Sequence, residues 1–319
     1  MNRFRLTLFS VFFCWLLAAG AYAAPFDPGR VGFAVTIDGD TLSHRNFFAT
    51  TLPRQNVALR FEHGADPAAF AVSSAQGKAK RADTGWSWRA PATPGIYPVT
   101  IEHRATGERM VLQMVVMVPA QQARSGNLNG YPMGTYPQPL KGMASYRAPL
   151  GFIEVTEQNR DTPLSPHFTL GQFLCKQSDN YPQYIVLQPS LLRKLEALLA
   201  AVNADGFRAD SLVVMSGYRT PNYNRSLGNT PYSRHVWGDA ADVFVDVKPK
   251  DGRMDDLNRD GKVDREDAAY LYRIADRVSR ELGPELAGGV GEYDSTSAHG
   301  PFVHVDTRGS YARWGHAGR

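Results

Sequence analysis

Residues 233–242 of this chain read SRHVWGDAAD, and residues 302–306 read FVHVD. Together they offer the imidazoles of His235 and His304 and the carboxylate of Asp242. Zn²⁺ accepts such a ligand set, and three protein ligands leave a fourth position open for water or substrate. The two stretches therefore predict a zinc site in the C-terminal half of the chain.

The second stretch alternates in the manner of a β-strand. Side chains alternate between the two faces of a strand, so His304 and Asp306 fall on one face and the valines beside them on the other. We expect the valines to enter a core and the polar pair to face a cleft. Asp242 begins a further apolar run, residues 242–247, and His235 precedes that run. A loop and a strand end would thus bring both residues to one sheet edge.

The C-terminal part, residues 163–319, alternates predicted strands and helices. Residues 211–215, SLVVM, form another buried apolar run. Apolar residues recur with the i, i+3, i+4, i+7 spacing of a helix after Pro189 and again before Gly283. These residues are Leu191, Leu192, Leu195, Leu198, Leu199 and Val202 in the first stripe, and Leu271, Ile274, Ala275, Val278 and Leu282 in the second. The pattern predicts an α+β fold in which helices back a sheet.

The spacing Ser-x-His-x-x-Gly-x-Ala-x-Asp in residues 233–242 resembles the signature of the zinc D-Ala-D-Ala peptidases, a superfamily that also contains the hedgehog signalling domain. Residues 164–170, LSPHFTL, residues 216–220, SGYRT, and residues 302–309, FVHVDTRG, are similar to segments of its exported bacterial members. The resemblance covers the C-terminal half of the chain. It implies a hedgehog- or D,D-peptidase-like α+β zinc domain with an antiparallel sheet and helices.

The resemblance also implies roles for individual residues. Zinc would be bound by His235, Asp242 and His304, and a water in the open position would attack an amide carbonyl. Arg219 would stabilise the oxyanion or hold a substrate carboxylate, although a surface ion pair is the alternative. Ser233 would fix the loop or contact the substrate.

The general base is harder to assign. Relatives supply a Glu three residues before the last ligand or a His two residues before it, where this chain has Pro301 and Phe302. Asp306, on the same predicted face as His304, is the first candidate, and its alternative role is to orient that imidazole. Glu292 and His299 are the further candidates for the base.

These features predict a periplasmic zinc metallopeptidase that hydrolyses peptidoglycan stem peptides. It would act as a D,D- or L,D-carboxypeptidase or as an endopeptidase. The alternative is a noncatalytic zinc-containing module that binds cell-wall peptides or a protein partner.

Residues 256–267, DLNRDGKVDRED, match a calcium loop of the EF-hand type inserted in the zinc domain. The position that usually carries Glu is an Asp, as in the calcium loops of dockerin modules, which this stretch resembles. The expected Ca²⁺ ligands are Asp256, Asn258, Asp260, Lys262 through its carbonyl, Asp264 and Asp267. We expect a structural calcium clamp, and a solvated acidic turn is the alternative.

The N-terminal half has a different pattern. Residues 57–61, 96–101 and 110–118 are short β-branched or aromatic runs separated by turn residues. They predict an immunoglobulin-like β-sandwich over residues 25–120, serving either as a spacer or as a binding module. Residues 121–162, rich in Gly, Pro, Asn and Tyr, are expected to form a linker or a packed strap.

The first residues carry an export signal. A basic start, an apolar core and the sequence AYA at residues 21–23 predict a signal peptide over residues 1–23 and a periplasmic location. No later run is long enough to span a membrane. Lys and Arg are scattered and the formal net charge is only +4, which argues against a nucleic-acid partner. Removing the signal leaves Cys175 as the one cysteine, expected to be buried and inert.

Overall fold

The computed structural model describes residues 25–62 and 65–315. The predicted signal peptide, residues 1–23, lies outside the described residues. Among the residues that are described, no helix is both long enough and apolar enough to cross a membrane. Cys175 is buried, and burial raises the pKa of its thiol, which is consistent with an inert side chain.

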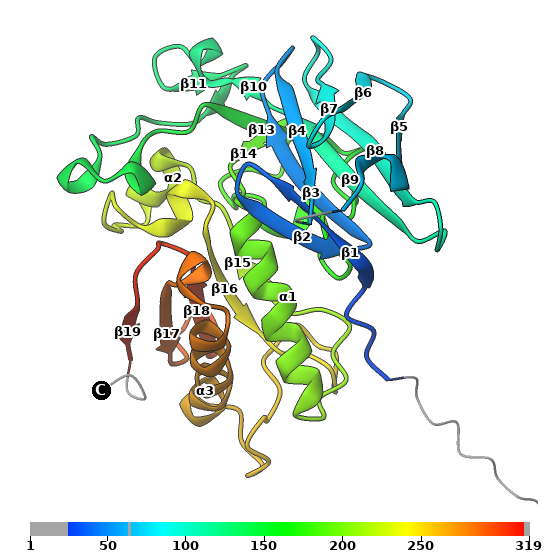
Figure 1. The fold of residues 1–319 in the computed structure, drawn as a ribbon. Helices are drawn as coiled ribbons and strands as arrows, with labels where there is room; N and C mark the ends of the chain where they lie inside the picture. Colours follow the sequence, from blue (N-terminus) through cyan, green and yellow to red (C-terminus); the bar gives the residue numbers. More distant parts are fainter. Residues whose placement is uncertain (1–24, 63–64, 316–319) are drawn as a thin grey trace, which may run out of the picture.

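The N-terminal part forms two sheets, drawn in blue and cyan in Figure 1. One has the strand order β2-β1-β4-β7-β6 and the other β3-β9-β8-β5. Neighbouring strands are antiparallel, except that β3 runs parallel to β9. The strands are β1 (Arg30–Ile37), β2 (Asp40–His44), β3 (Asn46–Thr51), β4 (Asn56–Phe61), β5 (Phe70–Ser74), β6 (Lys78–Ala82), β7 (Gly85–Arg89), β8 (Gly95–His103) and β9 (Arg109–Val116).

Alternating burial explains how these strands pack. Along β4, Val57 and Leu59 are buried while the residues between them are exposed, and Trp88 on β7 lies fully buried opposite Val57. The prediction of a mixed α and β chain is confirmed. Two sheets alone do not define an immunoglobulin-like topology. The immunoglobulin-like class of the N-terminal part therefore stays a prediction.

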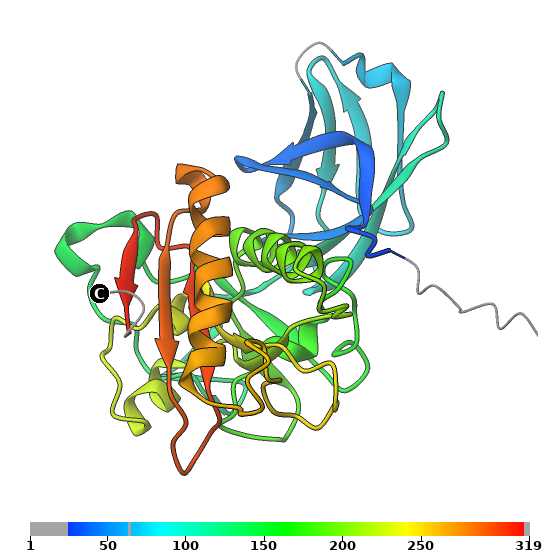
Figure 2. The ribbon, with the colours of Figure 1, turned by 90° about the horizontal axis from the view of Figure 1, so that it is seen from below.

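The C-terminal part is built on one five-stranded sheet of order β15-β16-β18-β17-β19. The strands are β15 (Val213–Ser216), β16 (Ala240–Phe244), β17 (Gly289–Tyr293), β18 (Phe302–Asp306) and β19 (Ala312–Trp314), and only the pairing of β17 with β19 is parallel. The helices are α1 (Pro189–Ala204), α2 (Pro221–Ser226) and α3 (Arg265–Glu281). Figure 2 shows α3 lying along the sheet, where it packs on β17, β18 and α1. The predicted apolar stripes face this core.

A fourth, smaller sheet is formed by strands from residues 118–185. Its order is β10 (Val118–Pro119), β13 (Gly151–Val155) and β14 (Gln183–Ile185), and β11 (Asn127–Leu128) pairs separately with β12 (Tyr131–Pro132). The short 3-10 helices are η1 (Pro67–Ala69), η2 (Ala120–Gln122), η3 (Leu140–Gly142), η4 (Ala144–Tyr146), η5 (Leu170–Phe173), η6 (Arg234–Trp237) and η7 (Pro284–Leu286).

Part of the segment predicted as a linker or strap packs against the C-terminal part. The Tyr136 hydroxyl lies 2.9 Å from that of Tyr218 and donates to the carbonyl of Val236 at 3.1 Å. One continuous cluster of buried apolar side chains extends from β1 to β18. The boundaries proposed from sequence, at about residues 120 and 162, therefore do not interrupt the core.

Candidate metal centre and active site

Three side chains meet on one face of the C-terminal sheet. His235 comes from η6, Asp242 from β16 and His304 from β18. Asp242 and His304 are direct partners in the antiparallel register, so their side chains lie on the same face at short range. The Nε2 of His235 lies 3.2 Å from the Oδ1 of Asp242 and 3.2 Å from the Nδ1 of His304, which is itself 2.9 Å from that Oδ1. All three side chains are buried.

The outer atom of each imidazole is held by a hydrogen-bond acceptor. The Nδ1 of His235 lies 2.7 Å from the carbonyl oxygen of Gly217, and the Nε2 of His304 lies 3.1 Å from the Oδ2 of Asp306. A carbonyl only accepts, so the Nδ1 of His235 carries hydrogen and its Nε2 turns inward as an acceptor. Metal-binding histidines are oriented in this way in proteins.

The carboxylate of Asp242 is held by Arg219. The guanidinium donates to the outer Oδ2 of Asp242 at 2.6 Å, and its Nε donates to the Oγ of Ser216 at 2.9 Å. This pair leaves Oδ1 directed at the two imidazoles. Arg219 therefore forms an ion pair with a buried carboxylate of the candidate metal centre and not with a surface partner.

The electrostatics of the centre favour a cation. Burial lowers the pKa of His304, but the hydrogen bonds that its ring donates to Asp242 and Asp306 outweigh that effect and raise the pKa to about 9. Burial lowers the pKa of His235. The Nδ1 of His304 and the Oδ1 of Asp242 lie 2.9 Å apart at the place where a metal ion would bind, so a proton on that nitrogen would compete with the metal.

The loop that carries His235 is locked from several sides. Gly238 has φ +69°, and a Cβ there would overlap the carbonyl of Val186. Arg234 forms a buried bidentate pair with Asp239, and its guanidinium lies 4.5 Å above the ring of Tyr146. The sequence predicted the turn at Gly238, but it did not assign roles to Arg234, Asp239 or Tyr146. Asp239, directly after Gly238, was the signal in the sequence that could have revealed the Arg234 pair. A buried carboxylate beside a ligand loop needs a cationic partner.

A cavity of about 520 Å³ opens over the three side chains. Arg219 and Ser233 line it, as predicted for substrate contacts, and so does His299. Its aromatic side consists of Tyr232, Tyr293, Phe302 and Trp314. The structure therefore brings the predicted ligands, Arg219 and Ser233 together at one site.

Comparison with known proteins agrees with this geometry. Residues 166–266 match the model of a family described as Peptidase M15.

Over these residues the chain is similar to the M15 peptidases.

The M15 match contains Arg219, Ser233, His235 and Asp242, and it ends before His304, which the fold supplies from β18. The family is zinc-dependent, in agreement with the clustered imidazoles and carboxylate. No curated protein matches the chain significantly.

Asp306 is not placed to act as a general base at this site. It is fully buried, and its oxygens accept from the backbone N–H of Gly289 at 2.8 Å and from the guanidinium of Arg308. Its Oδ2 contacts the outer nitrogen of His304, on the side of the ring away from the cavity. The prediction of Asp306 as the base is corrected in favour of its alternative role, orienting His304.

Glu292 does not face the cavity either. In the β17–β18 register it lies opposite Val303, whereas Gly291 lies opposite His304. Paired residues share a face, so Glu292 is directed to the helix-covered side of the sheet. The prediction of Glu292 as a base is therefore corrected. Of the three candidates, His299 is the one that lines the cavity.

The predicted calcium loop is closed by its own backbone. Both oxygens of Asp267, which was expected to ligate Ca²⁺, accept backbone N–H groups, from Leu257 at 2.7 Å, Asn258 at 3.1 Å and Asp264 at 2.9 Å. Asp256, Asn258 and Asp260 likewise accept backbone N–H groups within the loop. Within the described ranges, the only cluster suited to a metal is His235, Asp242 and His304. The geometry does not support calcium.

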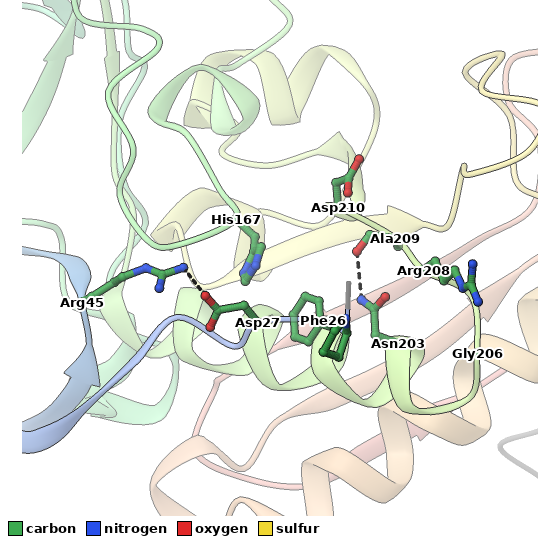
Figure 3. A pocket seen from close by; sticks show the side chains of 10 residues that line it. Phe26, Asp27, Arg45, His167, Asn203, Gly206, Arg208, Ala209 and Asp210 are labelled. Carbon is green, nitrogen blue, oxygen red and sulfur yellow. Dashed lines mark hydrogen bonds and ion pairs between the residues drawn. The ribbon is translucent and has the colours of Figure 1, made fainter. Parts of the chain in front are cut away.

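A second cavity, of about 600 Å³, lies where the N-terminal segment meets the end of α1 (Figure 3). Phe26 stacks on His167 at 4.8 Å, and Arg45 pairs with Asp27 at 2.6 Å. It contains none of the site residues predicted from the sequence, and its lining joins residues 25–27 to the C-terminal part of the chain.

Proposed function

We propose that this protein is a zinc metallopeptidase that hydrolyses peptidoglycan stem peptides in the periplasm, as a D,D- or L,D-carboxypeptidase or an endopeptidase. One observation carries the proposal: the inner atoms of His235, Asp242 and His304 converge at the floor of a solvent-reaching cavity, in a chain that is similar to the M15 peptidases over residues 166–266. The predicted signal peptide over residues 1–23 supports the location.

The residues present fit Zn²⁺. Two imidazoles and a carboxylate are borderline donors suited to zinc, and each is held by a second group that fixes its inner atom. Bound there by His235, Asp242 and His304, zinc would supply Lewis acidity for an amide carbonyl and for water.

The remaining groups have roles that follow from their positions. Arg219 holds Asp242, and its cationic edge at the cavity also suits an oxyanion or a substrate carboxylate. Ser233 lies at the start of η6, where its hydroxyl reaches the substrate space. The Nδ1 of His299 lies 2.8 Å from the carbonyl of Gly300, so it carries hydrogen and leaves Nε2 as the acceptor.

We assign the proton transfers to this Nε2. In the proposed reaction the oxygen of a water molecule bonds to the amide carbon, and His299 takes the proton that is released. The C–N bond then breaks, and the proton passes to the leaving amine. The imidazole ends in its starting state.

A muropeptide assay tests the proposal. The mature protein is incubated with purified muropeptides, with and without a chelator, and the products are identified by mass. We expect chelator-sensitive loss of a terminal residue or splitting of a cross-link, restored by adding Zn²⁺. Intact muropeptides beside protein that holds one zinc per chain would contradict a peptidase.

One observation favours the alternative of a noncatalytic zinc-containing module that binds wall peptides or a protein partner. Pro301 and Phe302 occupy the positions from which relatives supply a base, and neither Asp306 nor Glu292 reaches the cavity. This alternative predicts muropeptide binding without cleavage. It also predicts that His299→Ala leaves binding unchanged.

A further inference from the structure

Tyr293 stands beside the candidate metal centre. It is the last residue of β17 and pairs with Phe302, two positions from the pairing of Gly291 with His304. Side chains two apart on a strand share a face, so Tyr293 lies on the face that carries the imidazole of His304. Its ring lines the cavity and is 40% exposed, so a ligand in the cavity can reach it.

The phenol is held in one orientation. Its ring stacks on Phe302 at 4.6 Å with an angle of 8° between the planes. The indole Nε1 of Trp314 donates a hydrogen bond to the Tyr293 hydroxyl at 2.9 Å. Trp314 itself lies 5.1 Å from the ring of His304, measured between centroids. An indole N–H can only donate, so the Tyr293 oxygen is the acceptor and its own O–H remains for another partner.

The position of the indole depends on two glycines of β17. A Cβ at Gly291 would overlap the pyrrole part of the Trp314 ring, and a Cβ at Gly289 would lie 2.8 Å from its benzene part. The indole therefore lies flat against this strand, with the guanidinium of Arg308 5.5 Å from its centre. Strand, indole and phenol form a fixed unit at the edge of the cavity.

The hydroxyl is a neutral donor near neutral pH. Burial raises the pKa of Tyr293, and the negative charge of Asp242 raises it further. A phenol of this kind neither supplies nor removes protons easily, but it hydrogen-bonds strongly to an oxygen on which negative charge develops. Preorganised donors of this type stabilise tetrahedral intermediates in acyl transfer.

We propose that the Tyr293 hydroxyl donates a hydrogen bond to the carbonyl oxygen of a peptide bound at the metal centre, and that Trp314 is the residue that positions it. The inference rests on the proposed function. It identifies the substrate group that the Tyr293 hydroxyl binds as a carbonyl oxygen that gains negative charge during the reaction.

The test compares Tyr293→Phe with the wild type on a muropeptide that the wild type cleaves. The variant keeps the ring and its stacking on Phe302 and loses only the hydroxyl. We expect kcat to fall on the order of 100-fold, the effect typical of removing one oxyanion donor, with KM and zinc content nearly unchanged. Tyr311→Phe is the matched control, because Tyr311 is an exposed tyrosine that does not line the cavity, and it should behave as the wild type.

The role of Trp314 is tested by a double-mutant cycle. Trp314→Phe keeps a ring and removes the N–H, so kcat should fall about 10-fold with a smaller change in KM. In the Tyr293→Phe background the same change should have little further effect on kcat, because the hydroxyl that the indole positions is gone. Full additivity of the two changes would show that Trp314 acts only through packing.

Failure of this inference is distinguishable from failure of the proposed function. A wild type that cleaves, beside a Tyr293→Phe variant with unchanged kcat, overturns the inference alone. If the wild type cleaves no muropeptide, the proposed function fails, and binding of a phosphinate analogue of D-Ala-D-Ala decides the inference. If the zinc-loaded Tyr293→Phe variant binds the analogue at least 10-fold more weakly than the zinc-loaded wild type, the contact is supported. If both proteins bind it equally, or if neither binds it, the inference is overturned.

Discussion

At the scale of single residues, each candidate ligand has a partner that aims it. Gly217 fixes His235, Arg219 fixes Asp242, and Asp306 fixes His304. The sequence could reveal the ligands because their types and spacing are chemically restricted. It could not reveal the partners, because which atom of Arg219 or Asp306 faces the metal centre depends on how separate strands align.

The orienting role of Asp306 leads to a prediction for Asp306→Asn. The amide is a weaker acceptor for the His304 N–H, so we expect zinc affinity to fall 10- to 100-fold while kcat at saturating zinc changes little. Competition with a fluorescent zinc chelator measures the affinity. If Asp306 were the base, the variant would instead keep its zinc and lose turnover.

The same substitution also breaks a buried pair with Arg308, so its effect on folding needs a control. Loss of one partner of a buried pair costs about 3–5 kcal/mol, and Asp306→Asn should therefore melt earlier. The control is Asp276→Asn. Asp276 lies on α3 and is not among the candidate metal ligands, and its carboxylate pairs with the guanidinium of Arg313. This substitution should lower the melting temperature without weakening zinc binding.

At the scale of elements, the sequence predicted most of what periodicity can encode. Both long helices follow their apolar stripes, and β18 has the predicted bounds. The strand predicted over residues 242–247 ends earlier, at Phe244. Two residues later the carboxylate of Asp246 accepts hydrogen bonds from the backbone N–H groups of Asp251 and Gly252, which belong to the following loop. The face of Glu292 was not predictable, because β17 carries two glycines and has no readable alternation.

Asp267 was predicted as a calcium ligand, but in the structure it caps the start of α3. A substitution of this residue distinguishes the two roles. Its carboxylate is fully buried and accepts three backbone N–H groups, so Asp267→Ala should destabilise the protein by about 3 kcal/mol. Millimolar Ca²⁺ should leave the melting temperature of the wild type unchanged. A calcium-dependent rise that Asp267→Ala abolishes would restore the calcium site predicted from the sequence.

At the scale of the whole molecule, the N-terminal sheets and the C-terminal part share one core and a set of charged contacts between them, which we call the charged seam. Arg193 on α1 donates to Asp40 on β2 at 3.1 Å, across the boundary predicted from sequence. His44, at the end of β2, is buried beside this seam and stacks on Phe47 at 5.2 Å. Sequence could not predict these contacts, because they join segments about 150 residues apart without any shared motif.

The seam makes stability depend on pH through His44. Burial lowers its pKa to about 4, Arg30, Arg193 and His167 lower it too, and Glu196 opposes them. The unfolded chain has the ordinary value of about 6.5, so between pH 6.5 and 4 the unfolded state binds more protons than the folded state. The contribution of His44 to stability is therefore fully present above pH 6.5 and is lost on acidification, by roughly 2 to 3 kcal/mol at pH 4.5.

His44→Phe keeps a stacking ring and removes this titration. We expect urea denaturation to show that the free energy of unfolding falls between pH 8 and pH 4.5 by roughly 2 to 3 kcal/mol less in the variant than in the wild type. Taking the difference between the two pH values cancels any constant effect of the substitution on packing. Equal losses in both proteins would mean that His44 is protonated in the folded state, and that the seam opens to water before the core does.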